Sequence, residues 1–203
     1  MKKLAKLCTR HNWPRQHNLH KSLPQLYLFS DAERLPDPSS LLSLLPRGAC
    51  VVLRHTDRQS LVSLAQLIIP QARKLGLKVI VAGDIRLALQ VGANGTHLSE
   101  ATARCRRPRT KTAKRGFFIT AAAHTRMAIW RARQAGADLI FLSPVFETKS
   151  HPGARRLGAL RFAVLARTSQ TPIIALGGIT QSSATRLALG PAYGLAAIGA
   201  WRN

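Results

Sequence analysis

Short runs of apolar residues recur along the chain, and most of them are continuous rather than alternating with polar residues. They cover residues 25–31, 49–54, 77–84, 95–99, 116–120, 137–143, 172–178 and 193–199. Continuous apolar runs of this length are typical of parallel strands that are covered on both faces. We therefore expect each of these runs to form a buried strand of one parallel sheet.

Segments with the periodicity of amphipathic helices lie between these runs. They are residues 61–76, 85–93, 125–137, 157–168 and 182–190, and a glycine often follows, as at a helix end. Strands that alternate with helices predict a (β/α)8 TIM barrel, with a doubly wound open sheet as the alternative. We expect one barrel domain over residues 25–203, with its last helix short or missing, and a basic arm over residues 1–24.

The charge of the chain is strongly positive. Its 203 residues include 31 Lys and Arg against 8 Asp and Glu, which gives a formal net charge of +23. Such an excess attracts polyanions and phosphorylated small molecules. No apolar run approaches the ~20 residues of a membrane span, and the basic N-terminal segment lacks the apolar stretch of a secretory signal. We expect a protein that does not enter membranes.

The cysteines also bear on location. Cys8, Cys50 and Cys105 are widely spaced and form no CxxC motif. This argues against a disulfide framework or a zinc site and fits free thiols in a reducing compartment. We therefore expect the protein to be cytoplasmic.

Glycines follow the last two predicted strands. Gly177 and Gly178 come after the seventh, and Ile198 and Gly199 end the eighth. In a TIM barrel the active site gathers at the carboxyl ends of the strands, and phosphate sites favour the loops after strands 7 and 8. Glycine lets backbone N–H groups approach an anion closely. A tight turn would also explain the Gly177–Gly178 pair, but the second glycine and the basic composition favour phosphate binding.

Charged residues end other predicted strands. Arg54 could clamp phosphate or diphosphate oxygens, or it could form a salt bridge with Asp31 or Asp84. Asp84 and Glu100 end adjacent strands, so they could share a Mg²⁺ ion near a diphosphate or simply neutralise nearby arginines. Neither a Ser–His–Asp order nor an HExxH motif appears, so nucleophilic and zinc-dependent hydrolysis have no support.

Five segments carry a resemblance to known proteins. In chain order they read GANGTHLSE, ITAAAHT, GADLIFLSPVFETKSHPGARRLG, PIIALGGIT and YGLAAIGA. In sequence and spacing they resemble the thiamine phosphate synthase/TenI family, and the likeness runs from Leu26 to the C-terminus. The resemblance implies a TIM barrel that couples hydroxymethylpyrimidine diphosphate to thiazole phosphate and releases diphosphate, with Mg²⁺ as cofactor.

The resemblance also assigns roles to individual residues. Arg54 matches the arginine of the family's QLRxK diphosphate motif. Two hydroxyls match the PTxTK loop and three residues match backbone donors, all of which grip the thiazole phosphate; these residues are Thr148, Ser150, Gly178, Ile198 and Gly199. We expect small phosphorylated substrates as partners.

The diphosphate and metal end departs from the family pattern. Val52 and Thr56 stand where Gln and Lys flank the family's arginine, and residues 99–102 hold no counterpart of its metal-binding Asp. His151 replaces the lysine that ends PTxTK. The histidine of TenI tautomerases falls on Pro144, so that activity would need another proton carrier, for which His124 and His151 are the candidates.

Three functions therefore remain open. The first is a thiamine phosphate synthase in which Asp84, Glu100 and extra arginines substitute for the missing ligands. The second is a TenI-like or catalytically silent barrel that binds thiazole phosphate or thiamine phosphate. The third is a cationic nucleic-acid-binding protein that uses residues 104–115 and the N-terminal arm. Non-specific attraction of polyanions follows from charge alone, and the sequence leaves a homo-oligomer open.

Overall fold

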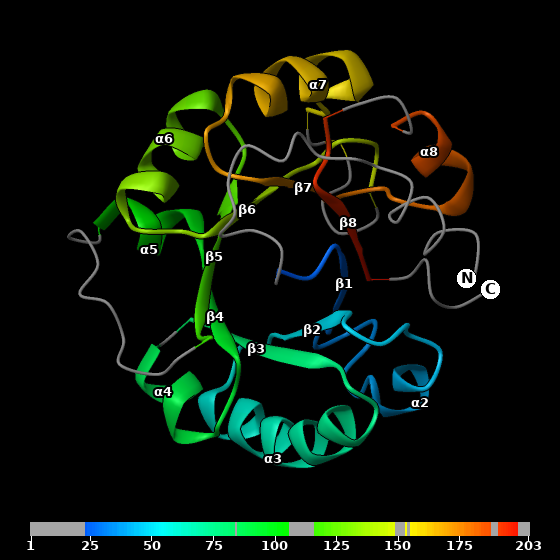
Figure 1. The fold of residues 1–203 in the computed structure, drawn as a ribbon, viewed down its shortest axis with the longest axis vertical. Helices are drawn as coiled ribbons and strands as arrows, with labels where there is room; N and C mark the ends of the chain where they lie inside the picture. The colour runs from blue at the N-terminus through cyan, green and yellow to red at the C-terminus, as the bar shows by residue number, and fades with distance from the viewer. Residues whose placement is uncertain are drawn as a thin grey trace.

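The strands of this protein close into a ring. In the computed structural model, which describes residues 23–83, 85–105, 116–148, 153, 155–187 and 191–198, each strand pairs in parallel with the next and β8 pairs with β1. Figure 1 shows the helices on the outside of this ring. The expected TIM barrel is confirmed, and the open sheet is excluded.

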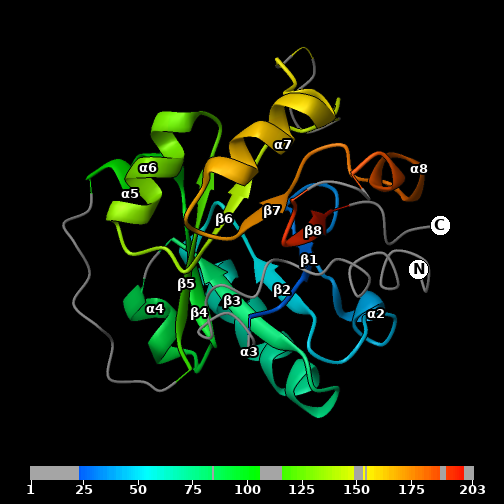
Figure 2. The same cartoon turned by 45° about the horizontal axis from the view of Figure 1, so that its top comes forward.

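The elements alternate as the sequence pattern predicts. The strands are β1 (Leu26–Phe29), β2 (Cys50–Leu53), β3 (Lys78–Ala82), β4 (Gly95–Leu98), β5 (Phe118–Ala123), β6 (Leu139–Leu142), β7 (Ile173–Ala175) and β8 (Gly194–Ala197). The helices are α2 (Ser39–Leu42), α3 (Arg58–Lys74), α4 (Ile85–Gln90), α5 (Glu100–Cys105), α6 (Arg126–Gln134), α7 (Gly158–Thr168) and α8 (Gln181–Thr185). Figure 2 shows the same arrangement obliquely.

Three details differ from the sequence-based expectation. Strand β5 continues to Ala123 rather than ending at Thr120, and α2 and α5 are short helices that the pattern did not predict. An Ala-Ala-Ala run and helices of one or two turns leave no measurable periodicity, which is why the pattern missed them. Residues 1–22 and 199–203 lie outside the described residues, so the N-terminal arm and the short or missing last helix stay predictions.

The strands are apolar on both faces because each face packs into a different layer. Along β1, Leu26 and Leu28 belong to the outer core between the strands and the helices. Tyr27 and Phe29, which alternate with them, belong to a separate cluster inside the barrel. This period of two, with both faces buried, is what produces the continuous apolar runs in the sequence.

Helix α3 illustrates how the outer layer forms. Asp57 caps the N-terminus of the helix, because its carboxylate accepts a hydrogen bond from the Ser60 N–H at 2.6 Å. The residues that this helix buries recur at helical spacing; they are Leu61, Ala65, Ile68, Ile69 and Ala72.

None of the helices in the described ranges combines the length and the apolar character that a bilayer span requires.

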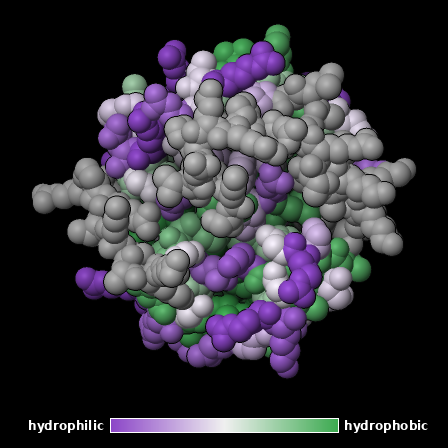
Figure 3. Space-filling model, viewed as in Figure 1, coloured by the Kyte–Doolittle hydropathy of each residue, from purple (hydrophilic) through white to green (hydrophobic). Residues whose placement is uncertain are grey.

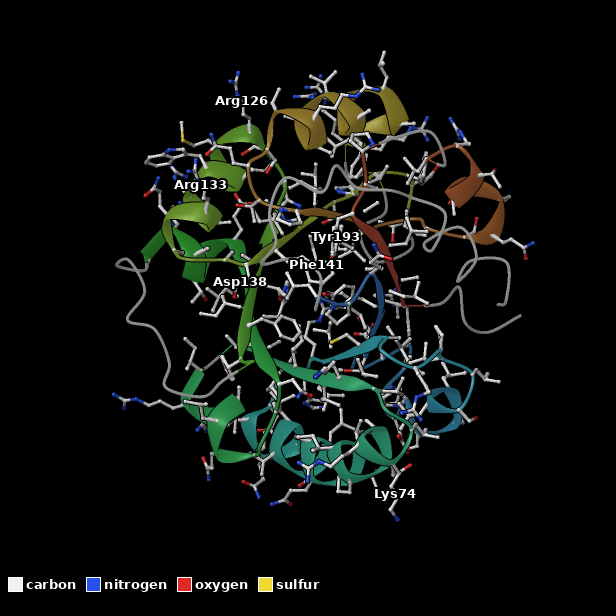
Figure 4. The ribbon with its side chains drawn as sticks, in the orientation of Figure 1. Lys74, Arg126, Arg133, Asp138, Phe141 and Tyr193 are labelled. Atoms are coloured by element: carbon white, nitrogen blue, oxygen red, sulfur yellow. The ribbon has the colours of Figure 1, made fainter. Side chains whose placement is uncertain are left out.

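Aromatic rings fill the barrel interior. Phe141 contacts Tyr27 edge to face, with ring centroids 4.9 Å apart, and contacts Phe29 in the same way at 5.0 Å. Figure 4 shows Phe141 and Tyr193 near the middle of the ring of strands. The Tyr193 hydroxyl donates to the Leu23 carbonyl at 3.0 Å. The buried Tyr27 hydroxyl, in contrast, has no hydrogen-bond partner within the described residues.

His97 is a buried member of this interior. Its Nδ1 lies 2.9 Å from Thr120 Oγ1, and Thr120 Oγ1 donates in turn to the Thr96 carbonyl at 3.4 Å. Because the threonine proton is directed to that carbonyl, Nδ1 carries the proton of the neutral imidazole. Burial lowers the pKa of His97 to about 3, and the positive charge of Arg54 acts in the same direction. His97 is a satisfied core histidine.

The two buried tyrosines should respond oppositely to loss of their hydroxyls. Tyr27→Phe removes a buried group without a partner, and we expect it to raise the free energy of unfolding by about 1 kcal/mol. Tyr193→Phe breaks the hydrogen bond to Leu23 and should lower it by about 1 kcal/mol. Urea denaturation measures both. A loss of stability in Tyr27→Phe equal to that in Tyr193→Phe would contradict the assignment.

His97 should make the protein sensitive to acid. The folded protein holds it neutral to about pH 3, whereas the unfolded chain binds a proton near pH 6.5. Stability from this residue is therefore complete above pH 6.5 and is lost as the pH falls, with a slope that approaches about 1.4 kcal/mol per pH unit. We expect His97→Gln to show a shallower loss between about pH 6 and pH 4 in urea denaturation. Equal slopes in the two proteins would argue against a depressed pKa.

Candidate active site

A carboxylate at the end of β1 holds two arginines. Asp31 accepts hydrogen bonds from the Arg34 side chain, at 3.0 Å from Nη2 and 3.2 Å from Nε. It also accepts from Arg54 Nη2 at 2.8 Å. Ser30 fixes the position of Arg54 further, because its Oγ accepts the Arg54 N–H at 2.8 Å and donates to the Arg54 carbonyl. The salt bridge to Asp31, one of the two alternatives for Arg54, is thus confirmed.

The salt bridge leaves an excess of positive charge. The Asp31 side chain is only 10% exposed, while that of Arg54 is 51% exposed. Hydrogen bonds from the Arg34 side chain hold the pKa of Asp31 at about 2, although burial acts in the opposite direction. Two guanidinium groups share one carboxylate, so the cluster carries a net positive charge with N–H groups still open to solvent. Pairing with Asp31 and binding an anion are therefore compatible.

Arg34 is a member of this cluster that sequence reasoning missed. It lies beyond the end of β1, in a turn closed by the backbone pairing of Asp31 with Leu35. The signal was present as an Asp and an Arg at positions i and i+3, but that spacing is common on surfaces. Only the turn brings the side chain back over the strand end.

The glycines after β7 are required by a close approach of two loops. Gly177 and Gly178 have φ of +90° and +65°, values that side chains rarely allow. A Cβ atom on Gly177 would lie 2.8 Å from Pro144 Cα, and one on Gly178 would collide with the Glu147 carbonyl. The tight turn considered as an alternative is therefore real, and it is formed against the loop that follows β6.

Backbone hydrogen bonds join the same two loops. The Val145 N–H donates to the Leu176 carbonyl at 2.9 Å, and the Phe146 N–H donates to the Gly177 carbonyl at 3.0 Å. Within the described residues, the N–H groups of Gly177 and Gly178 donate to no protein acceptor. The loop pair thus has backbone donors available for an anion.

The remaining phosphate candidates lie on either side of these glycines. Thr148 follows Glu147, whose carbonyl packs on Gly178. Ile198 follows β8, the neighbour of β7 in the barrel, so its end lies on the same rim. Residues Ser150, His151 and Gly199 lie outside the described residues, and their roles stay predictions.

A histidine–carboxylate pair lies at the ends of β4 to β6. The Glu100 carboxylate accepts the His124 backbone N–H at 3.0 Å, and its Oε2 lies 3.9 Å from His124 Nε2. His124 Nδ1 donates to the Ser143 carbonyl at 2.7 Å, which leaves Nε2 to accept a proton. The side chains of His124 and Glu100 are 50% and 35% exposed.

His124 occupies this position because β5 is longer than expected. The strand ends at Ala123, so His124 lies at its carboxyl end. Thr125, and not His124, caps α6, since its hydroxyl accepts the Ala128 N–H at 3.1 Å. The ITAAAHT segment was the available signal, but an alanine run does not reveal where a strand ends.

The described carboxylates do not form a Mg²⁺ site. Within the described ranges, no three His, Cys, Asp or Glu side chains cluster as metal ligands would. Glu100 is engaged by His124 and Asp31 by two arginines. Asp84, the other candidate ligand, lies outside the described residues. The Mg²⁺ site therefore stays a prediction, and no catalytic step is assigned to it.

Comparison with solved structures supports the barrel fold. A thiamine phosphate pyrophosphorylase from Pyrococcus furiosus superposes with a TM-score of 0.70 at 21% identity, covering 90% of this chain and 88% of that one. FabK from Thermotoga maritima superposes with a TM-score of 0.64 at 14% identity, covering 92% and 62%. At such identities the likeness concerns the fold alone.

Comparison of sequences identifies the family. A relative from Aquifex aeolicus is 31% identical over 183 residues, 87% of this chain and 96% of the relative. The thiamine-phosphate synthase of Anoxybacillus flavithermus is 28% identical over 191 residues, which cover 90% and 87%. The family model described as thiamine monophosphate synthase matches residues 26–201. The chain therefore belongs to the thiamine monophosphate synthase family.

Proposed function

We propose that this protein is a transferase of thiamine biosynthesis that couples hydroxymethylpyrimidine diphosphate to thiazole phosphate and releases diphosphate. One observation carries the proposal beyond family membership. The barrel rim carries two separate groups of hydrogen-bond donors that an anion could contact. One consists of the guanidinium groups of Arg34 and Arg54 after β1 and β2, and the other of the glycine N–H groups after β7. Only β8 separates these strands in the ring. Two anion sites on one rim suit a reaction between two phosphorylated substrates.

The glycine loop would hold the thiazole phosphate. The free N–H groups of Gly177 and Gly178 supply neutral donors, and the hydroxyls of Thr148 and Ser150 would add two more from the facing loop. Gly199 would complete the grip from the end of β8. Because the loops are joined by backbone hydrogen bonds, the phosphate is held in a fixed position, which lets the protein orient the thiazole nitrogen toward the second substrate.

The arginine pair would hold the diphosphate. As the bond between the pyrimidine methylene carbon and the diphosphate oxygen breaks, negative charge grows on the leaving group. Fixed N–H donors stabilise that charge without reorganisation. Arg34 supplies a second guanidinium where the family's Gln and Lys are replaced by Val52 and Thr56. Asp31 positions both arginines.

A second function, thiazole tautomerase activity, is favoured by one observation. The Nε2 atom of His124 is free of the Ser143 hydrogen bond and lies beside Glu100, so His124 could carry a proton at the barrel mouth. Loss of tautomerase activity in His124→Gln, with synthase activity retained, would support it. His151 is the other candidate proton carrier.

The hypothesis of nucleic-acid binding depends on residues 104–115, of which 106–115 lie outside the described residues. It stays a prediction, as do the cytoplasmic location and a homo-oligomer.

The arginine pair should govern binding of the diphosphate substrate. We expect Arg54→Gln and Arg34→Gln each to lower kcat/KM for hydroxymethylpyrimidine diphosphate by about tenfold or more, because each loses a charge-assisted hydrogen bond. Arg133→Gln, at an exposed position on α6, removes the same charge elsewhere and should have no effect. Thiamine phosphate formation is measured with both substrates, with and without Mg²⁺. An equal loss in all three variants would contradict a specific role for the pair.

The glycine loop should govern binding of thiazole phosphate. In wild-type protein, thiazole phosphate is expected to raise the melting temperature at millimolar concentration. Gly178→Ala should abolish that stabilisation, since the new methyl group displaces the loop that carries Thr148. Thr148→Val keeps the side-chain shape and should weaken binding by about tenfold through loss of one hydroxyl. Stabilisation without product formation in the wild type would identify a silent binding barrel; no stabilisation at all would contradict the site.

A further inference from the structure

A hollow lies at the end of the barrel opposite the candidate active site, where β3 and β4 begin. Its volume is about 230 Å³. Its apolar residues are Ile69, Leu77 and Val79, and its polar residues are Arg73, Lys78 and Asn94. Since β3 starts at Lys78 and β4 at Gly95, these residues lie at the amino ends of the strands. The hollow shares no residue with the candidate active site.

Asn94 presents a hydrogen-bond donor to this hollow. Its Oδ1 accepts the Val79 N–H at 2.9 Å, which fixes the orientation of the side-chain amide. Nδ2 is therefore the free end, and it has no partner within the described residues. The two N–H groups of this half-buried amide are therefore available to an acceptor that enters the hollow.

Several backbone carbonyls around the hollow are already used. The Gly76 carbonyl accepts the Gly48 N–H at 2.9 Å, and the Val79 carbonyl accepts the Asn94 N–H at 2.7 Å. At the end of α3, the Arg73 carbonyl accepts the Gly76 N–H at 3.1 Å. These three carbonyls are therefore not free acceptors, whereas the Asn94 amide is a free donor within the described part of the chain.

Two arginines lie at the same place. Arg73 lines the hollow, and the Arg47 guanidinium lies over Gly76, 3.2 Å from where a Cβ atom would stand. Lys78 also borders the hollow, but it shares its face of β3 with Ile80, which belongs to the cluster inside the barrel. Among the described residues, none of these three side chains forms an ion pair, and no Asp or Glu lines the hollow. Lys74, next to Arg73 in sequence, points away from the barrel (Figure 4) and takes no part.

From these observations we propose that the hollow is a second anion site, which binds the phosphate group of a small phosphorylated molecule. Donors without acceptors and cations without counter-ions select an anion. The apolar wall of Ile69, Leu77 and Val79 would contact the carbon part of the ligand, and the volume limits that ligand to a small phosphate ester. Because the site uses no active-site residue, it stands independently of the proposed function.

Amide chemical shifts test the site directly. Inorganic phosphate, added to ¹⁵N-labelled protein at constant ionic strength, should shift the signals of Gly76, Gly92 and the Asn94 side-chain amide with a saturable dependence. Chloride should not. The active-site glycines, Gly177 and Gly178, report separately on binding at the other end. Shifts that do not saturate, or that chloride reproduces, would overturn the proposal.

Asn94→Asp is the sharpest variant. It keeps the oxygen that accepts the Val79 N–H and replaces the donor with a charged oxygen, so it should weaken phosphate binding by about tenfold or more without disturbing the fold. Arg47→Gln/Arg73→Gln should weaken binding to a similar extent. Arg161→Gln/Arg167→Gln removes the same charge from exposed positions on α7 and is the matched control. Equal weakening in the control would mean general charge attraction and would overturn the proposal.

The same titration distinguishes the source of the phosphate. Ribose 5-phosphate, a small ester, should shift the same signals and bind at least as tightly as inorganic phosphate, and both affinities should fall in Asn94→Asp. Short single-stranded DNA carries the same phosphate chemistry in a polymer. If the pocket signals respond to DNA alone, or if DNA shifts spread over the surface while ribose 5-phosphate shifts nothing, the small-molecule site is excluded.

Discussion

The closure of the barrel between its first and last strands is the constraint on which the rest of the structure depends. Leu26 pairs with Leu195 and Leu28 with Ala197, which joins residues from the two ends of the described chain. Without this pairing, the arginines after β1 and β2 would lie at one edge of an open sheet and the glycine loop toward the other. Closure places both at one rim, and it also encloses the aromatic interior in which His97 stays neutral.

The sequence was most informative where physical periodicity is strong. All strands were predicted, because burial on both faces gives continuous apolar runs. The carboxyl ends that carry Arg54, Glu100 and Gly177 followed from the barrel hypothesis. Arg34 and His124 were not foreseen as partners, because a turn in one case and an alanine-rich strand end in the other decide their positions. Contacts of this kind depend on loop geometry, which leaves little trace in hydrophobic spacing.

The few acidic residues are largely committed to structure. Asp57 caps α3, Asp31 holds two arginines, and Glu100 accepts from His124. Glu147 pairs with Arg156 at 3.3 Å. Little negative charge remains to balance the basic residues. On the face that Figure 3 presents, hydrophilic residues lie at several separate places, both at the edge and near the middle. Net positive charge attracts any anion, whereas the arrangement of donors at each barrel end is local, and only the latter can give specificity.

The contact between the loop after β6 and the loop after β7 depends on few side chains. The loops meet mainly through main-chain atoms, with the glycines against the Pro144 and Glu147 backbone and amides donating to carbonyls; the Cβ atoms of Pro144 and Phe146 add to the contact. Side chains on the loop after β6, apart from those proposed to contact the phosphate such as Thr148, can therefore be exchanged without breaking the contact between the two loops. A backbone contact of this kind tolerates changes in the side chains around it, which makes this loop the natural place to engineer new chemistry.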